Sequence, residues 1–371
     1  MPRHLIAIDA SGLSPKPTGS DRYTLNLVRA LARVDDEHDY VVYARRFSLP
    51  DLAGLGSRFR IVEAGPWAPG GRHVWQQAGL ALDLMRRRVR LLHSPNQSTP
   101  RMVPCRRVVT INDLAPLILP EEYEPARRSV LQQAVQRADA VLAPSDSLAN
   151  EIVDLLGADE ARIHVTYGGV DTTFRAMDPE QCANLVQDRY GLHAGYLLSV
   201  GAGMPSKNRA TAFHTLRRLL DQGRDTHLAI IGDDGSLAQE ATISDLGLRD
   251  QITYCGYVAQ QDLPALYNSA AVLLHPALHD GLGLSVLEAM ASGAPVVVTD
   301  RSTPPELTGD AGLVVDPTDV EANAAAVARV LDDSALATRM RFDGLKRASE
   351  FSWEACAERT VAVYRLVLGE D

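Results

Sequence analysis

The sequence has 371 residues, of which 46% are hydrophobic and 23% are charged. This composition excludes a disordered chain, and the length suits two domains of about 150–200 residues each. The net charge is −10, so a nucleic-acid-binding surface is not indicated, and an anionic ligand must be held by a local group of donors.

The four cysteines form no C-x-x-C pair and no zinc-type spacing, which indicates free thiols in a reducing cytoplasm. No run of about 18 apolar residues could span a bilayer, and the first residues lack the apolar core of a signal peptide. We therefore expect a cytoplasmic protein without a transmembrane segment. Short arginine runs at 86–88 and 106–107 leave a peripheral membrane contact open.

Apolar runs of strand length alternate with amphipathic helical stretches along the whole chain. The first series predicts strands at 5–9, 40–44, 91–93, 108–111, 140–143 and 163–166, with helices at 22–33, 74–88, 126–137 and 147–156. The second series predicts strands at 196–200, 227–231, 252–254, 271–274, 296–299 and 313–315, with helices at 209–221, 237–246, 262–269 and 284–291. Runs that are apolar on both faces and separated by helices predict parallel sheets. The fold class is therefore α/β, with two Rossmann-like, doubly wound domains.

A glycine-containing stretch at 167–171 interrupts this alternation and marks the expected domain boundary. We expect an amino-terminal domain over 1–170, a carboxy-terminal domain over 171–350 and a closing segment over 351–371. The tail predicts helices at 320–331, 336–348 and 353–368. The last helix either completes the second domain or packs back on the first. In open α/β sheets ligands bind outside the carboxyl ends of the strands, so we expect the site in a cleft where two such edges face each other.

The strongest chemical signal is the segment 276–291, in which a strand end, a glycine loop and a helix follow one another. Glycines allow a ligand to approach the backbone, and the free N–H groups of a helix start attract phosphate. Asp280 precedes the helix and Glu288 lies inside it, so the two carboxylates could bind different hydroxyls of one elongated ligand. A tight turn with a solvated aspartate and a surface glutamate is the structural alternative.

This segment resembles the E-x7-E signature of the family 4 retaining glycosyltransferases, and in particular their mannosyltransferase-like members. Segments 18–31, 196–208, 300–317 and 351–353 resemble other motifs of that family in the same order. The resemblance implies a GT-B fold and a nucleotide diphosphate sugar as donor, with no further cofactor. It also implies a front-face reaction that retains the anomeric configuration without a metal. The first domain would then bind the acceptor and the second the nucleotide sugar.

The resemblance also implies roles for single residues. It places Lys207 at the donor diphosphate, Asp280 at the donor sugar and Glu288 on the ribose hydroxyls. As catalytic residues it indicates Asp280, Lys207, Asn112 and Asp113, and as an acceptor contact His93. The remaining donor-binding residues that it indicates are Gly19, Gly201, Tyr257, Val258, Gly281, Leu282 and Gly283.

Four positions depart from the family pattern. Asp280 replaces the usual glutamate and shortens the reach to the sugar, and Asn112 replaces a histidine. Asp21 stands at the second glycine of the amino-terminal G-x-G motif, and Ala202 stands where many relatives place an arginine. These departures predict an unusual donor or acceptor, or a reduced activity.

We expect transfer of a hexose-type sugar to a hydroxyl acceptor, either a glycan or a specialised metabolite. A GDP-linked donor is one option among several, and the sequence fixes neither the acceptor nor the oligomeric state. One alternative is a nucleotide-sugar-binding subunit without turnover. Another is a nicotinamide-dependent oxidoreductase, suggested by the glycines at 201 and 203, although Ser206 replaces the third glycine of that motif. The chain contains no D-x-D triplet, so no metal site is predicted.

Overall fold

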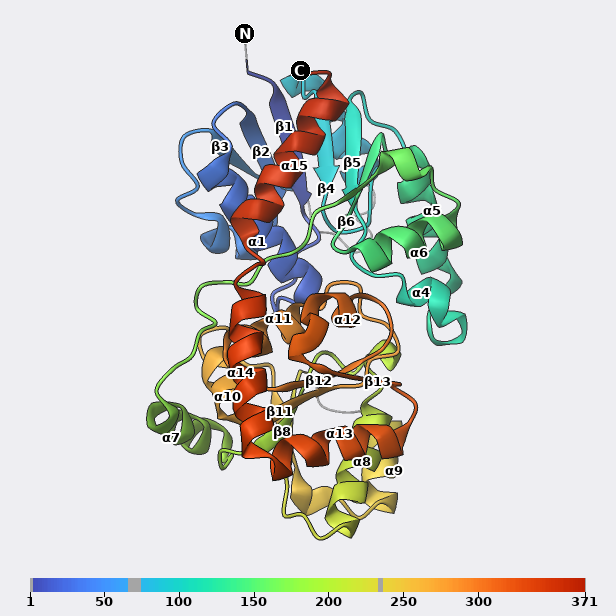
Figure 1. Cartoon of the computed structure of the whole chain (residues 1–371). Helices are drawn as coiled ribbons and strands as arrows, with labels where there is room; N and C mark the ends of the chain where they lie inside the picture. The colour runs from blue at the N-terminus through green and yellow to red at the C-terminus, as the bar shows by residue number, and fades with distance from the viewer. Residues whose placement is uncertain (1–2, 66–74, 233–235, 371) are drawn as a thin grey trace. The chain divides into compact units, whose positions relative to one another are not determined.

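The computed structural model describes residues 3–65, 75–232 and 236–370. Its contacts divide the chain into two compact units, which are described separately (Figure 1). The first unit consists of Met1–Gly169 together with Ser352–Asp371, and the second consists of Val170–Phe351. The first unit is thus built from both ends of the chain.

The first unit contains a seven-stranded sheet in the order β3-β2-β1-β4-β5-β6-β7, in which neighbouring strands are parallel. Its strands are β1 (Leu5–Ala10), β2 (Asp39–Ala44), β3 (Phe59–Glu63), β4 (Leu91–Ser94), β5 (Arg106–Thr110), β6 (Ala140–Ala143) and β7 (Ile163–Val165). The central strands are buried on both faces, as their uninterrupted apolar sequences predict.

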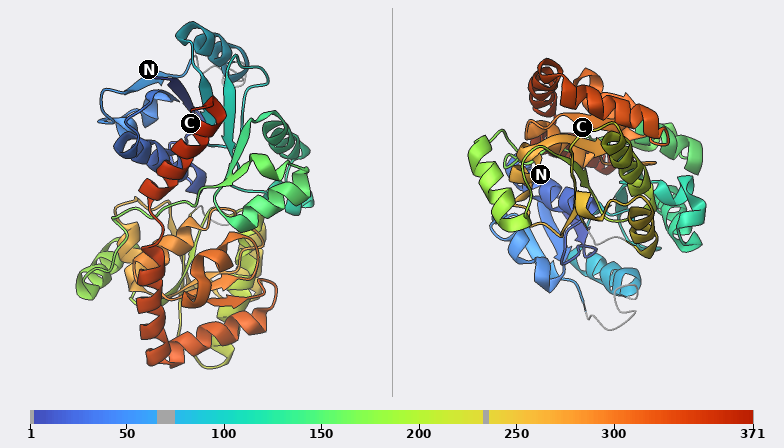
Figure 2. Two further views of the ribbon diagram at one scale, coloured as in Figure 1. Left: turned by 45° about the horizontal axis from the view of Figure 1, so that its top comes forward. Right: turned by 90° about the horizontal axis from the view of Figure 1, so that it is seen from below.

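Helices cover both faces of this sheet, as Figures 1 and 2 show. They are α1 (Gly19–Val34), α3 (Leu80–Arg87), α4 (Ala115–Ile118), α5 (Pro125–Arg137), α6 (Asp146–Leu156) and α15 (Trp353–Leu368). Helix α3 packs on β1, β2 and β4, whereas α5 and α6 pack on β5 and β6. Helix α15 lies against α1 and contacts β5 and β6. Its apolar face is therefore covered within the first unit.

The second unit contains a six-stranded parallel sheet in the order β10-β9-β8-β11-β12-β13. Its strands are β8 (Tyr196–Val200), β9 (Leu228–Ile231), β10 (Ile252–Gly256), β11 (Ala270–His275), β12 (Val296–Thr299) and β13 (Leu313–Val315). Its helices are α7 (Pro179–Tyr190), α8 (Arg209–Asp221), α9 (Leu237–Asp245), α10 (Leu263–Ser269), α11 (Leu284–Ala291), α12 (Thr303–Thr308), α13 (Val320–Asp332) and α14 (Ser334–Ala348). Helices α8, α9, α13 and α14 contribute to one core against this sheet.

These two sheets confirm the predicted α/β class with two Rossmann-like halves. Among the described strands and α-helices, β3, α7 and the short helices α4 and α12 were not predicted. Strand β3 lies at the sheet edge, where Arg60 and Glu63 are exposed and interrupt the apolar pattern. Helix α7 buries only Cys182 and Val186, so its sequence reads as a polar connection. In the parts of the chain that the structure describes, no helix combines the length and apolar character needed to span a membrane.

Candidate active site

The candidate site of the second unit lies at the carboxyl edge of its sheet. Two loops meet there: 201–208 follows β8, and 276–283 follows β11. The backbone N–H groups of Leu278 and His279 both donate to the Ser206 carbonyl, at 2.8 and 3.4 Å. These hydrogen bonds hold the two loops together. Parallel strands bring their carboxyl ends to one edge, which explains why Lys207 and Asp280, which are far apart in the sequence, share one site.

Lys207 and Asp280 form the centre of this site. The Lys207 ammonium Nζ lies 2.8 Å from Asp280 Oδ2, and the lysine side chain keeps 24% of its surface exposed. The same carboxylate accepts hydrogen bonds from the N–H groups of Leu282 and Gly283 at 3.3 and 3.2 Å. Asp280 therefore holds both the lysine and the start of α11 in place.

His275 is the second titratable partner of this carboxylate, after Lys207. Its Nε2 lies 2.9 Å from Asp280 Oδ2, and its side chain is buried. Burial lowers the pKa of His275, with Asp280 acting in the opposite direction. Burial alone would raise the pKa of Asp280, but the Lys207 ammonium and the His275 ring hold it well below its usual range. Asp280 is thus an ionised acceptor that carries no proton near neutral pH.

Two glycines fit this arrangement for steric reasons. Gly201 has φ +142°, and a Cβ at this position would lie 3.3 Å from two carbons of the Lys207 side chain. Gly283 has φ +61°, and a Cβ there would lie 2.4 Å from a methyl group of Leu307. The neighbouring Gly281 carbonyl accepts a hydrogen bond from Thr303 Oγ1 at 3.0 Å. Because Gly201 and Gly283 have no side chain, the loop backbone can lie close to Lys207 and to α12.

Glu288 lies on α11 and is buried, with only 5% of its surface exposed. The hydroxyl of Tyr267, from α10, donates to Glu288 Oε2 at 3.0 Å. This hydrogen bond fixes the orientation of the carboxylate. Because the carboxylate is buried, the alternative of a surface glutamate is excluded, and binding of the ribose by Glu288 stays a prediction.

Three further positions singled out in the sequence follow strands β10 and β8 at the same edge of the sheet. Tyr257 and Val258 come directly after β10; the tyrosine is half exposed and the valine is buried. Ala202 follows β8, and no arginine occupies its place. Instead the buried Arg209, at the start of α8, donates to the Gly201 carbonyl at 2.6 Å. Arg209 thus adds a second positive charge beside this loop, next to that of Lys207.

His93, the predicted acceptor contact, lies at the end of β4 in the first unit and is fully buried. Its Nδ1 lies 2.6 Å from the Tyr364 hydroxyl of α15, and its Nε2 lies 2.8 Å from Thr110 Oγ1. Burial lowers the pKa of His93 to about 3, so the ring is neutral. Both ring nitrogens have partners inside the unit, and acceptor binding by His93 stays a prediction.

Asn112 and Asp113 follow β5 at the carboxyl edge of the first sheet. Asn112 is 1% exposed and donates from Nδ2 to the Pro95 carbonyl at 2.8 Å. Its Oδ1 is buried and has no hydrogen-bond partner within the described parts of the chain. Asp113 accepts a hydrogen bond from the Ala115 N–H at 2.9 Å and so caps the turn that begins α4.

Gly19 is the first residue of α1, and the departure at Asp21 has a local explanation. Both the backbone N–H and the hydroxyl of Thr18 donate to Asp21 Oδ2, at 2.9 and 3.0 Å. Asp21 therefore caps its own helix, and its negative charge favours the helix start. The structure brings Lys207, Asp280 and Glu288 into one unit, and Gly19, His93, Asn112 and Asp113 into the other.

The sequence interpretation did not assign His275 and Tyr267 to the site. His275 ends β11, so the rule that places ligands at carboxyl ends of strands could have found it had the strand been extended by one residue. Tyr267 lies 21 residues before Glu288, and no local pattern indicates that contact. Among the described residues, no group of three or more His, Cys, Asp or Glu side chains is placed to hold a metal ion.

Two all-parallel Rossmann-like sheets, the second with a lysine, two buried carboxylates and a glycine loop at its carboxyl edge, have the architecture of the GT-B fold. The family model described as Glycosyltransferase Family 4 matches residues 17–174, and that described as Glycosyl transferases group 1 matches residues 192–347. The chain belongs to the family 4 glycosyltransferases. It is therefore an enzyme of glycosyl transfer with a nucleotide-sugar donor, which excludes the oxidoreductase alternative.

Curated relatives include mannosyltransferases. The chain is 32% identical to O-antigen chain mannosyltransferase B of Escherichia coli over 75% of this chain and 74% of that protein. It is 30% identical to MMP alpha-(1->4)-mannosyltransferase of Mycolicibacterium hassiacum over 63% of this chain but only 55% of that protein.

Solved structures share the fold. Sucrose-phosphate synthase from Thermosynechococcus elongatus aligns with a TM-score of 0.79 at 19% identity, over 100% of both chains. WaaG, a glycosyltransferase involved in lipopolysaccharide biosynthesis, aligns with a TM-score of 0.75 at 18% identity, over 96% of this chain and 99% of its own.

Proposed function

We propose that the enzyme transfers mannose from a GDP-linked donor to a hydroxyl of a glycan, with retention and without a metal ion. The mannosyltransferases among its relatives support the choice of sugar, and the O-antigen relative supports a glycan acceptor. The first unit would bind the acceptor and the second the donor. A cytoplasmic location fits the four free cysteines.

The Lys207–Asp280 pair carries this proposal. Its ammonium group lies at the strand edge where a diphosphate would bind, beside glycines that leave the backbone open. In the front-face reaction the acceptor oxygen bonds to the anomeric carbon while the bond between that carbon and the donor phosphate oxygen breaks. The acceptor proton passes to the departing diphosphate. Charge grows on that diphosphate, and a fixed cation stabilises it most in the transition state.

The other residues are assigned by position. Glu288, oriented by Tyr267, would accept hydrogen bonds from the ribose hydroxyls. Asp280 would hold Lys207 in place and reach the donor sugar. The unpartnered Asn112 Oδ1 would accept a hydrogen bond from a sugar or acceptor hydroxyl, because a buried amide oxygen gains most from a partner. Gly19, Asp113 and His93 keep their predicted roles in this proposal.

A panel of GDP-, UDP-, dTDP- and ADP-sugars tests the donor by thermal shift, because a ligand that binds only the folded protein raises its midpoint. We expect GDP-mannose to give the largest shift. Turnover with mannose-terminated glycans should then continue after EDTA treatment and give an α-linked product by NMR. A larger shift with a UDP-sugar, or loss of turnover in EDTA, would contradict the proposal.

A further inference from the structure

A groove of about 1070 Å³ lies in the first unit, away from the residues assigned above. Its walls come from the end of α3, the starts of β4 and β5, and the end of α15. Residues 84–90, 103–106 and 366–369 contain most of its lining. All of these segments belong to the first unit, so the groove is complete within that unit.

The groove lies at the amino edge of the sheet. Arg90 directly precedes β4, Cys105 directly precedes β5, and Asp139 directly precedes β6. Asn112 and Asp113 lie after the other end of β5. A five-residue strand separates the two edges by about 17 Å. The groove is therefore a different place from the carboxyl edge where the acceptor is expected.

The lining of this groove is basic although the whole chain carries −10, because it contains Arg88, Arg90 and Arg106 and one acid, Asp139. Residues 80–107 contain seven arginines and one aspartate. Arg88, Arg90 and Arg101 are exposed and have no ion pair within the described parts of the chain. The one acid of the lining, Asp139, is already paired with Arg106 at 2.8 Å. The local surplus is thus not neutralised by neighbours.

Large apolar side chains are exposed beside these arginines. Leu82 and Met85 on α3 are 55% and 54% exposed, Met102 is 78% exposed and Leu366 on α15 is 64% exposed. Met85 and Leu366 line the groove itself. Apolar side chains of this size in water, surrounded by arginines, are the combination that binds the interface of an anionic bilayer.

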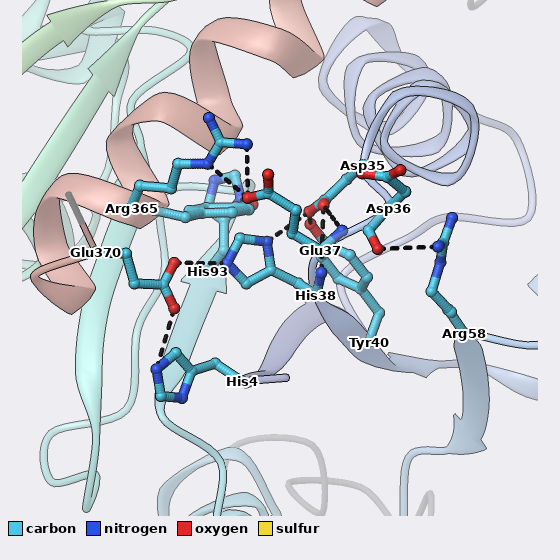
Figure 3. A network of polar contacts seen from close by, with 11 residues as sticks. His4, Asp35, Asp36, Glu37, His38, Tyr40, Arg58, His93, Arg365 and Glu370 are labelled. Carbon is cyan, nitrogen blue, oxygen red and sulfur yellow. Dashed lines mark hydrogen bonds and ion pairs between the residues drawn. The ribbon is translucent and has the colours of Figure 1, made fainter. Parts of the chain in front are cut away.

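The groove has fixed walls. Arg88 caps α3 in the left-handed conformation with φ +58°, a position that usually holds glycine. Residues 366–369 are held on both sides: Arg365 pairs with Glu37, and Glu370 contacts His4 and His38 (Figure 3). These contacts hold the backbone of two walls of the groove in place.

We propose that this surface docks the enzyme on an anionic lipid bilayer, with the arginines at the lipid phosphates and Met85, Met102 and Leu366 in the interface. Lipid is favoured over nucleic acid because the patch offers exposed aliphatic side chains but, in the parts of the chain that the structure describes, no aromatic ring among its lining residues for stacking on bases. Each arginine near such a surface contributes about a fivefold gain in binding.

Co-sedimentation of the full chain with vesicles tests the proposal. We expect binding to phosphatidylcholine vesicles that contain about 30 mol% phosphatidylglycerol, weaker binding at high salt and no binding to pure phosphatidylcholine. The double variant Arg88→Glu/Arg90→Glu should bind the anionic vesicles at least tenfold more weakly than the unchanged chain. Met85→Ser/Leu366→Ser should weaken binding without removing its salt dependence.

Arg329→Glu/Arg339→Glu is the matched control, since it makes the same charge change on exposed positions of α13 and α14 in the second unit. It should bind vesicles to within about twofold of the unchanged chain, apart from the long-range effect of net charge. Thermal unfolding and the donor-induced shift check that each variant is folded. Absence of binding to anionic vesicles, equal loss in the control, or a dimer that the groove variants dissociate would overturn the proposal.

Discussion

At the scale of single residues, the Lys207 ammonium is proposed to bind the donor diphosphate, and it also compensates the charge of the buried Asp280. Lys207→Ala removes the cation proposed to lie at the diphosphate and leaves the buried Asp280 with only His275 and two backbone N–H groups as the partners described above. We expect kcat/KM to fall at least about 100-fold and the free energy of unfolding to fall by about 1–3 kcal/mol. Steady-state kinetics and urea unfolding measure the two effects.

The double variant Lys207→Ala/Asp280→Asn separates these effects. Replacing the carboxylate by an amide removes the uncompensated buried charge, so stability should return toward that of the unchanged chain. Transfer should stay low because the diphosphate still lacks its cation and the donor sugar lacks the Asp280 carboxylate. Recovery of transfer in the double variant would assign Lys207 only the role of neutralising Asp280.

The Tyr267 hydroxyl gives a second test at this scale. Tyr267→Phe removes the hydrogen bond to Glu288 while keeping the buried ring. If Glu288 holds the ribose, its looser carboxylate should raise KM for the donor about fivefold and leave kcat nearly unchanged. Tyr190→Phe is the control, because it removes a tyrosine–carboxylate hydrogen bond to Asp262 elsewhere in the same unit. An equal rise of KM in both variants would indicate a general loss of stability.

At the scale of elements, the sequence predicted the strands that are buried along nearly their whole length. Strands buried on both faces, such as β8 and β11, read as apolar runs, and the glycine loop after β11 was located directly. Strand β3 was missed because its buried and exposed residues follow no regular period, so its sequence shows no apolar run. Partners such as Tyr267, which approach the site from another helix, depend on packing that no local pattern encodes.

The start of α15 makes a tight backbone contact with Gly169 that one variant can probe. A Cβ on Gly169 would lie 2.2 Å from the Trp353 nitrogen and 2.4 Å from the Ser352 carbonyl carbon. Gly169→Ala should therefore displace α15 and lower the free energy of unfolding by about 2 kcal/mol or more. The expected readout is a lower midpoint in thermal unfolding.

Gly344→Ala is the matched control for this prediction. The added methyl group would meet Met290 at 3.5 Å, which is ordinary contact, and alanine favours a helix interior. It should leave the midpoint unchanged or raise it. A midpoint for Gly169→Ala that equals the control would show that the α15 start moves aside at no cost.

At the scale of the whole molecule, both ends of the chain close the first unit. The contact between His38 and Glu370 joins residues 332 positions apart. His38 Nδ1 lies 2.8 Å from Asp35 Oδ2, and its Nε2 lies 2.9 Å from Glu370 Oε2 (Figure 3). Two carboxylate acceptors require a proton on each ring nitrogen, so the contact needs the charged imidazolium.

This requirement makes the stability of the first unit depend on pH. Burial alone would lower the pKa of His38, but the hydrogen bonds to Asp35 and Glu370 raise it above its usual value. The stabilisation is therefore fully present below about pH 6.5 and is lost as the pH rises through the pKa of the folded protein. His38→Gln should cost about 1–3 kcal/mol at about pH 6 and less at about pH 8.5. Urea unfolding at both pH values measures this, with His214→Gln, an exposed histidine of α8, as control. A loss in His38→Gln that is equal at both pH values would show that the contact does not depend on the imidazolium charge.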